Sequence, residues 1–199
     1  MPNQMRDITL TVTGLRSHKL FGKDYNQSNY IGMVNFTTQF LTLNPFIKEV
    51  NIGMATGSDL MFGLGAIRYR AMSGGDLIIN CFVPGDNQTE YYSAKEKEIY
   101  DYILSKADSI VVTSQGPCTP DALKSRNKKM IKKTDWVLAF WNYHKAKSGT
   151  WNTINQAIKK DKTVYCVNPF NMGMREFYHV SEEDKEHIER LQKHYTINQ

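Results

Sequence analysis

The sequence lacks the features of several specialised protein classes. It has three cysteines among 199 residues, Cys81, Cys118 and Cys166, and no Cys-x-x-Cys pair or cysteine–histidine pair at metal-ligand spacing. Neither a disulfide framework nor a zinc site is therefore indicated, and we expect no metal and no resident cofactor. Thirteen glycines and six prolines are too few for a collagen-like or low-complexity chain.

Long hydrophobic runs are missing as well. No segment approaches the roughly 18 continuous apolar residues that cross a bilayer, and residues 1–7 contain no apolar signal-peptide core. We therefore expect a cytoplasmic protein with reduced thiols and no membrane partner. Hydrophobic residues make up 41% of the chain and charged residues 23%, which is typical of folded globular proteins. The length favours one domain over residues 1–199, with a core at about 7–167 and a C-terminal loop and helix at 168–199.

The formal net charge is only +5, but the basic residues are unevenly distributed. Residues 124–133 hold six of the 25 lysines and arginines. Such a cluster is either the solvated face of a helix or a groove for phosphate or nucleic acid, because clustered positive charge attracts polyanions. The cluster alone does not decide between these interpretations.

Apolar runs alternate with helical stretches along the chain. The runs predict six strands, at 8–13, 50–54, 77–83, 109–113, 136–141 and 163–167. The stretches between them predict helices, at 28–43, 58–72, 90–106, 119–133 and 150–160, with a further helix at 181–194. The strands are continuously apolar, as is typical of strands covered on both faces. The sequence therefore predicts an α/β fold with a doubly wound, mostly parallel, Rossmann-like sheet of about six strands and helices on both faces.

Ligands of such sheets bind beyond the carboxyl ends of the strands. The first predicted strand ends in Thr13 and Gly14, followed closely by Arg16. Here the backbone can approach a ligand closely, and a guanidinium suits phosphate or carboxylate. A plain turn with a surface arginine explains the same residues.

The second predicted strand runs into Gly53, Met54, Gly57 and Asp59. Two glycines at a strand-to-helix turn suit a loop whose amides face an anion. Asp59 either caps the following helix or accepts hydrogen bonds from ribose hydroxyls. The motif is neither a Walker loop nor a dinucleotide-binding fingerprint.

The strongest signal follows the fifth strand. Trp141 and Asn142 lead through Lys145 and Lys147 into Ser148-Gly149-Thr150 at a helix start. Free amides, hydroxyls and the positive end of the helix dipole form a phosphate site there. A simple helix cap would explain Thr150 but not the whole loop.

Four motifs in order resemble the SLOG superfamily, nearest to its YpsA-like branch, over about residues 7–167. They are Thr13-Gly14-x-Arg16, Gly53-Met54-Ala55-x-Gly57-x-Asp59, Arg126-Asn127, and Trp141-Asn142 followed by Ser148-Gly149-Thr150-x-x-Thr153. SLOG proteins are Rossmann-like nucleotide-binding proteins. They include cytokinin-activating phosphoribohydrolases, the DNA-processing protein of natural transformation, and sensor domains for nucleotide signals such as cyclic ADP-ribose derivatives. The resemblance implies that residues of these motifs line a nucleotide site. The candidate ligand-binding residues are Thr13, Gly14, Arg16, Gly53, Met54, Gly57, Asp59, Arg126, Asn127, Trp141, Asn142, Ser148, Gly149, Thr150 and Thr153.

The chain departs from the phosphoribohydrolase pattern at one position. That motif, Pro-Gly-Gly-x-Gly-Thr-x-x-Glu, ends in a glutamate that serves N-glycosidic cleavage, and Thr153 stands in its place here. A hydroxyl is no general base at neutral pH without an activating partner. Hydrolysis by the family's mechanism is therefore not expected.

Three functions stay open. In the first, the protein binds a nucleotide or an NAD- or ADP-ribose-derived small molecule as a sensor or sequestering protein, with its base against Trp141 or Tyr143. In the second, it is a nucleotide N-glycosidase or phosphoribohydrolase-like hydrolase, in which Asp59, Glu90 or Asp86 replaces the missing glutamate. In the third, it binds single-stranded nucleic acid through residues 124–133 and aromatic side chains. The expected partner is a nucleotide-type small molecule, with a homo-oligomer and nucleic acid as further alternatives.

Overall fold

The computed structural model describes residues 6–143, 148–186, 188 and 189. Its strands are β1 (Ile8–Gly14), β2 (Ile47–Ile52), β3 (Ile78–Val83), β4 (Ser109–Val112), β5 (Trp136–Phe140), β6 (Thr163–Val167) and β7 (Arg175–His179). Its helices are α1 (Ser28–Leu43), α2 (Ser58–Ser73), α3 (Ala94–Lys106), α4 (Pro120–Lys132) and α5 (Gly149–Ile158). Two 3-10 turns, η1 (Ser17–Lys19) and η2 (Glu182–Asp184), complete the elements.

The strands form one sheet in the order β4-β3-β2-β1-β5-β6-β7. Every neighbouring pair is parallel except β6 and β7, which are antiparallel. The predicted α/β class, the mostly parallel sheet and the helical connections are confirmed. The fold is therefore doubly wound about β1, from which the strand order runs in both directions.

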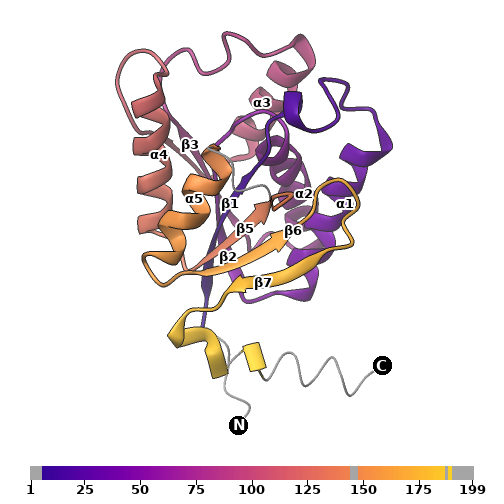
Figure 1. Cartoon of the computed structure of the whole chain (residues 1–199). Coiled ribbons are helices and arrows are strands. Elements are labelled where there is room, and N and C mark those ends of the chain that lie inside the picture. The colour runs from indigo at the N-terminus through magenta and orange to yellow at the C-terminus, as the bar shows by residue number, and fades with distance from the viewer. Residues whose placement is uncertain (1–5, 144–147, 187, 190–199) are drawn as a thin grey trace.

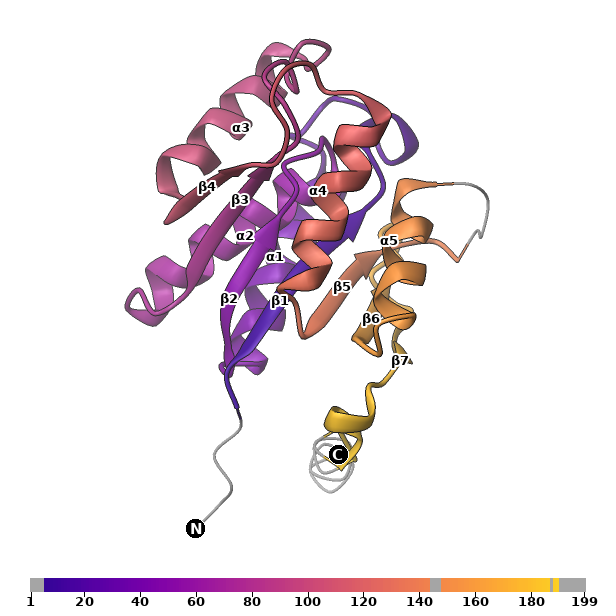
Figure 2. The same cartoon turned by 90° about the vertical axis from the view of Figure 1, so that its left-hand side faces the viewer.

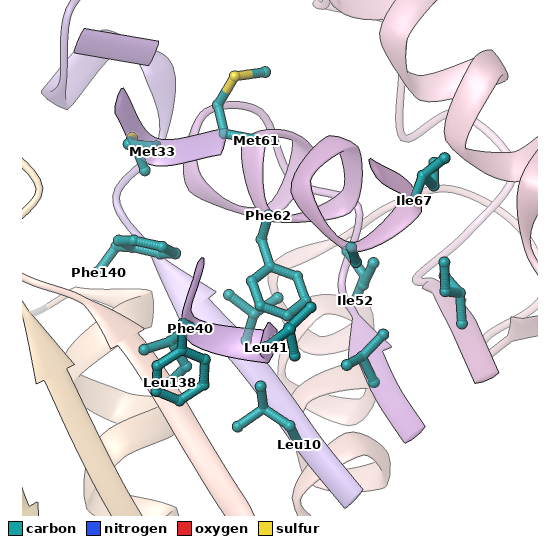
Figure 3. Close-up of a cluster of buried hydrophobic side chains, with 14 of the residues drawn as sticks. Leu10, Met33, Phe40, Leu41, Ile52, Met61, Phe62, Ile67, Leu138 and Phe140 are labelled. Atoms are coloured by element: carbon teal, nitrogen blue, oxygen red, sulfur yellow. The ribbon is translucent and has the colours of Figure 1, made fainter. Parts of the chain in front are cut away.

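The helices divide between the two faces of the sheet. Helices α1, α2 and α3 cover one face, and α4 and α5 lie side by side on the other (Figures 1 and 2). On the first face Leu10, Ile52 and Leu138 of the sheet pack against Leu41 and Phe62 of α1 and α2 (Figure 3). A second apolar cluster contains residues of α4, α5, β5 and β6. Both faces of the central strands are thus buried, which explains their continuous apolar sequences.

Local capping sets where the helices start. The Ser93 hydroxyl accepts a hydrogen bond from the Glu96 backbone N–H, and the Glu96 carboxylate accepts one from the Ser93 N–H, which is a capping box. Helix α3 therefore begins at Ala94 and not at residue 90 as predicted. Helix α4 starts at Pro120 behind the capping hydroxyl of Thr119, as expected for proline in a first turn.

The segment after β6 differs from the prediction. Residues 168–180 belong to the predicted C-terminal loop, but Arg175–His179 pair with β6 as an antiparallel edge strand. From Ser181 the described residues form η2 first, and part of the predicted helix at 181–194 lies outside them. In the part of the chain that the structure describes, no helix is long and apolar enough to cross a membrane.

Candidate functional site

A cavity lies where the topology of the sheet changes direction. Strands β1 and β5 are neighbours, but β1 continues into α1 on one face and β5 leads toward α5 on the other (Figure 2). Such a switch point leaves a crevice at the carboxyl ends of the strands. A cavity of about 590 Å³ occupies this position and is bordered by the end of β1, η1, α4 and α5.

The structure brings nine of the fifteen candidate residues to this cavity. They are Thr13, Gly14, Arg16, Asp59, Arg126, Asn127, Ser148, Gly149 and Thr150. These residues come from four separate segments of the sequence. The cavity therefore collects the turns that follow β1 and β2, the middle of α4 and the start of α5.

The first turn of α5 is fixed at the cavity by two hydroxyls. The Ser148 Oγ accepts a hydrogen bond from the Trp151 backbone N–H at 3.1 Å and caps the helix. The Thr150 hydroxyl donates to the Gly14 carbonyl oxygen at 2.8 Å and so joins α5 to the end of β1. The positive end of the helix dipole is thereby held at the cavity wall. Lys145 and Lys147, which were expected to add charge here, lie outside the described residues.

Arg126 places a buried cation in the wall of the cavity. Its Nη1 donates to the Gly53 carbonyl oxygen at 2.5 Å, and its Nε and Nη2 donate to Asn127 Oδ1 at 3.1 and 2.8 Å. Asn127 in turn donates to the Thr153 hydroxyl at 3.0 Å. Burial lowers the pKa of Arg126 and the negative charge of Asp59 opposes this, but an arginine side chain remains charged at neutral pH. Three of its five N–H groups are used in these bonds.

Asp59 lies beside this cation without forming an ion pair. A Cβ built on Gly53 would be 2.9 Å from both Asp59 Oδ2 and the Arg126 guanidinium carbon, so a side chain at this position would displace one of the two charged groups. Asp59 Oδ2 accepts a hydrogen bond from the Ala55 N–H at 3.1 Å. Burial raises the pKa of Asp59 to about 6, although the Arg126 charge and this hydrogen bond lower it. Among the described residues, no carboxylate comes within ion-pair distance of Arg126.

Gly57 lies behind the cavity and not in its lining. Its φ is +82°, and a Cβ there would come within 2.6 Å of the Leu15 carbonyl oxygen. Its N–H donates to the Tyr25 hydroxyl at 2.8 Å, so this amide does not face the cavity as predicted. Gly14 does line the cavity, but a Cβ there would overlap Ser58 at 2.4 Å. Close packing against neighbouring segments therefore requires glycine at both positions.

Trp141, which was expected to contact the base of a ligand, lies outside the cavity lining. Its side chain is 1% exposed and stacks on the Trp151 ring, with centroids 5.3 Å apart at 18°. Tyr143 packs against the Trp141 ring at 5.1 Å. The apolar run of β5 carries Trp141 into the core beneath α5, so neither Trp141 nor Tyr143 lines the cavity. The other candidates outside the lining are Gly53, Met54, Gly57, Asn142 and Thr153.

Two alternative catalytic carboxylates also lie away from the cavity lining. Asp86 accepts a hydrogen bond from the Gly116 N–H at 3.2 Å, and Glu90 accepts one from Asn87 at 2.7 Å. The Thr153 hydroxyl donates to the Gly149 carbonyl oxygen at 3.0 Å while it accepts from Asn127. Asp59 is the remaining carboxylate of the hydrolase hypothesis that lines the cavity.

Sequence reasoning offered the basic cluster at 124–133 as one candidate phosphate groove without singling out lysines, and it missed the polar residues on the side of α5. Lys124 and Lys128 of α4 line the cavity, as do Asn152, Asn155 and Gln156 of α5. The signal was the spacing of four between Lys124 and Lys128 and between Asn152 and Gln156, which places each pair on one helix face. Among the described residues, no three histidine, cysteine, aspartate or glutamate side chains gather as metal ligands would.

Comparisons with known proteins give relatives of the sequence and of the fold. No protein-family model matches the chain. It is similar to UPF0398 proteins of Bacillus thuringiensis (strain Al Hakam) and Bacillus cereus (strain AH187), with 28% identity over 111 residues. The match covers 55% of this chain and 59% of each relative, so it spans about three fifths of the length of these curated relatives.

Two solved structures share the fold. One is DNA processing protein A from Streptococcus pneumoniae, with a TM-score of 0.54 and 14% identity over 81% of this chain and 50% of that one. The other is DNA processing protein A from Helicobacter pylori, described for its single-stranded DNA binding mode. Its TM-score is 0.55, with 16% identity over 94% of this chain and 74% of that one. Both likenesses support the Rossmann-like arrangement of the sheet.

Proposed function

We propose that this protein binds a nucleotide, or a small molecule derived from NAD or ADP-ribose, in the cavity between α4 and α5. The buried charge of Arg126 carries the proposal. A buried cation is costly unless a charge of opposite sign approaches it, and Asp59 is close without pairing. A phosphate between Arg126, Arg16 and the first amides of α5 supplies that charge. Asp59 then accepts hydrogen bonds from the ribose.

Binding without turnover fits the contacts better than hydrolysis. The hydroxyl of Thr153 is engaged on both sides by Asn127 and Gly149, which leaves it no role as a base. Asp59 alone would have to serve both as a ribose partner and as a general acid or base. We therefore propose a sensor or sequestering protein of the SLOG class, in which residues 1–199 act as one domain.

Calorimetric titration with AMP, ADP, ADP-ribose and NAD tests this proposal. Arg16 is exposed at the cavity, so Arg16→Ala should leave the fold intact and weaken binding of the phosphorylated ligands about tenfold, as expected when a charge-assisted hydrogen bond of roughly 1.5 kcal/mol is removed. Arg68→Ala on α2 removes an exposed arginine away from the cavity and is the matched control. No binding of any of the four ligands, or their conversion to free base during incubation, would reject the proposal.

A second candidate function is binding of single-stranded nucleic acid. It is favoured by Lys124 and Lys128, which extend the positive charge of the cavity along α4. The Helicobacter pylori protein that shares the fold is described as a single-stranded DNA binder. Affinity for a nucleic acid should fall steeply with salt, whereas a flat response would reject this candidate.

A further inference from the structure

A second cavity adjoins the first between the same two helices. Its volume is about 470 Å³, and it shares Lys128 and Gln156 with the lining of the first cavity. Helices α4 and α5 run side by side from the carboxyl end of the sheet toward the opposite end (Figure 2). The two cavities therefore adjoin in the valley between the helices, and we call the second one the lysine groove.

Five of the seven residues that line the lysine groove are lysines, whose aliphatic stems form its walls. Its seven lining residues are Ser125, Lys128, Lys129, Lys132, Gln156, Lys159 and Lys160. On α4 the lysines continue the spacing of four from Lys124 through Lys128 to Lys132, so one helix face presents a row of cations toward α5. A helix rises 1.5 Å per residue, so this row is about 12 Å long.

These charges are not neutralised within the described part of the chain. Lys129 donates to the Thr113 carbonyl oxygen at 2.7 Å, but Lys128, Lys132, Lys159 and Lys160 have no carboxylate within ion-pair distance. Helix α5 contains no acidic residue, and the single acid of α4, Asp121, pairs with Lys124 at the other end of the helix. Convergent like charges repel one another, and a polyanion relieves that repulsion.

We infer that the lysine groove is a second phosphate subsite, and that the preferred ligand is a short single-stranded oligonucleotide. A terminal phosphate occupies the first cavity, and the following phosphates lie along the lysine groove. The inference rests on the nucleotide site of the proposed function and develops its second candidate, single-stranded nucleic acid, into a stated ligand and subsite. The two phosphates of a pyrophosphate are adjacent and cannot span a row of about 12 Å.

Fluorescence anisotropy tests the inference by measuring the affinity for oligothymidylates of increasing length, with and without a terminal phosphate. The affinity for thymidine monophosphate is measured for comparison. The groove variant is Lys132→Ala with Lys159→Ala, because both side chains line only the lysine groove. The control is Lys97→Ala with Lys133→Ala, which removes the same charge from exposed lysines outside both cavities. Thermal melting of both variants verifies that they fold.

We expect wild-type affinity to rise with oligonucleotide length until the lysine groove is filled, and to depend on the terminal phosphate. The groove variant should bind the oligonucleotide about tenfold more weakly and bind thymidine monophosphate as the wild type does. Removing one lysine that binds a phosphate should reduce the slope of log affinity against log salt by about 0.7, so removing two should reduce it by about 1.4. The control variant should match the wild type in oligonucleotide affinity and in the slope of affinity against salt.

Other outcomes separate the inference from the proposed function. Equal affinity for thymidine monophosphate and every oligonucleotide, or an unchanged oligonucleotide affinity in the groove variant, would overturn the inference and leave nucleotide binding standing. Failure of thymidine monophosphate and all oligonucleotides to bind would count against both. Capture by anionic vesicles that is abolished in the groove variant, without oligonucleotide binding, would also overturn the inference.

Discussion

Asp59 and Arg126 show how single residues shape the cavity. The sequence motifs predicted both, but from different segments and for different reasons. The structure places them on either side of Gly53, with the Gly53 carbonyl oxygen bound by Arg126 and by Gln88. The role of Gly53 as a spacer between two charges could not be predicted, because it depends on a contact between residues 73 positions apart.

The raised pKa of Asp59 predicts a pH dependence of stability. Burial raises the pKa of this carboxyl to about 6 in the folded protein, above the value of about 3.9 in an unfolded chain. The folded state therefore holds the proton between about pH 4 and 6 while the unfolded chain releases it, and the free energy of unfolding falls as the pH rises through this range. The contribution is full below pH 4 and lost above about pH 6.

Asp59→Asn should remove this pH dependence. An asparagine oxygen still accepts the Ala55 N–H, and the uncharged side chain avoids the cost of a buried anion. Relative to wild type, the variant should gain up to about 3 kcal/mol as the pH rises from 4 to 7. Urea unfolding at several pH values measures the difference, with the exposed Asp101→Asn as control. A difference that is constant from pH 4 to 7 would contradict the assignment.

At the scale of elements, the sequence pattern predicted the central strands and the helices better than the strand at the edge of the sheet. The strand ranges of β1, β4 and β6 were close to those observed, because each is an apolar run between turn residues. Strand β7 was missed because its sequence, Arg-Glu-Phe-Tyr-His, has no apolar run. It lies at an edge, and only its pairing with β6 identifies it as a strand. The burial of Trp141 was not predicted for a related reason, since it depends on how α5 packs across β5.

Glu96 joins the start of α3 to the two loops behind the cavity. Its carboxylate is fully buried and accepts hydrogen bonds from the Ser17 hydroxyl at 2.8 Å and the Tyr25 hydroxyl at 3.2 Å. Burial opposes ionisation, but hydrogen bonds from Ser93 and Ser17 hold the pKa of Glu96 below its ordinary value. Tyr25 then accepts from the Gly57 amide, so one carboxylate supports both turns.

Glu96→Gln should therefore weaken both stability and ligand binding. The carboxylate of Glu96 only accepts hydrogen bonds, whereas the amide NH2 of glutamine only donates them. Buried donors such as the Ser93 N–H would then lose an acceptor, at a cost of about 1–3 kcal/mol. We expect a lower melting temperature and weaker nucleotide affinity. Glu98→Gln on the same helix is the control, because its carboxylate is exposed and pairs with Lys95. Unchanged nucleotide affinity in a folded Glu96→Gln protein would show that the two loops keep their places without this carboxylate.

At the scale of the whole molecule, the alternation of strands and helices predicted the doubly wound sheet, and the sheet predicted the end at which a site would lie. The sequence also contained the basic cluster at 124–133. It could not show which lysines meet α5, because that depends on the placement of α4 beside α5. Lys159 and Lys160, which complete the lysine groove, follow a helix that was considered only for its first turn.

The lysine groove predicts how salt changes the stability of the free protein. Four of its lysines repel one another without a nearby carboxylate in the described residues, so the folded state carries an electrostatic cost that salt screens over a Debye length of about 10 Å at 0.1 M. The melting temperature should rise from low to moderate salt.

The Lys132→Ala and Lys159→Ala variant should melt above wild type at low salt, and this difference should shrink as salt is added. The Lys97→Ala and Lys133→Ala control should show a smaller difference because it leaves the groove charges in place. Equal salt responses of the three proteins would mean that the groove lysines are too far apart, or too well hydrated, to repel one another.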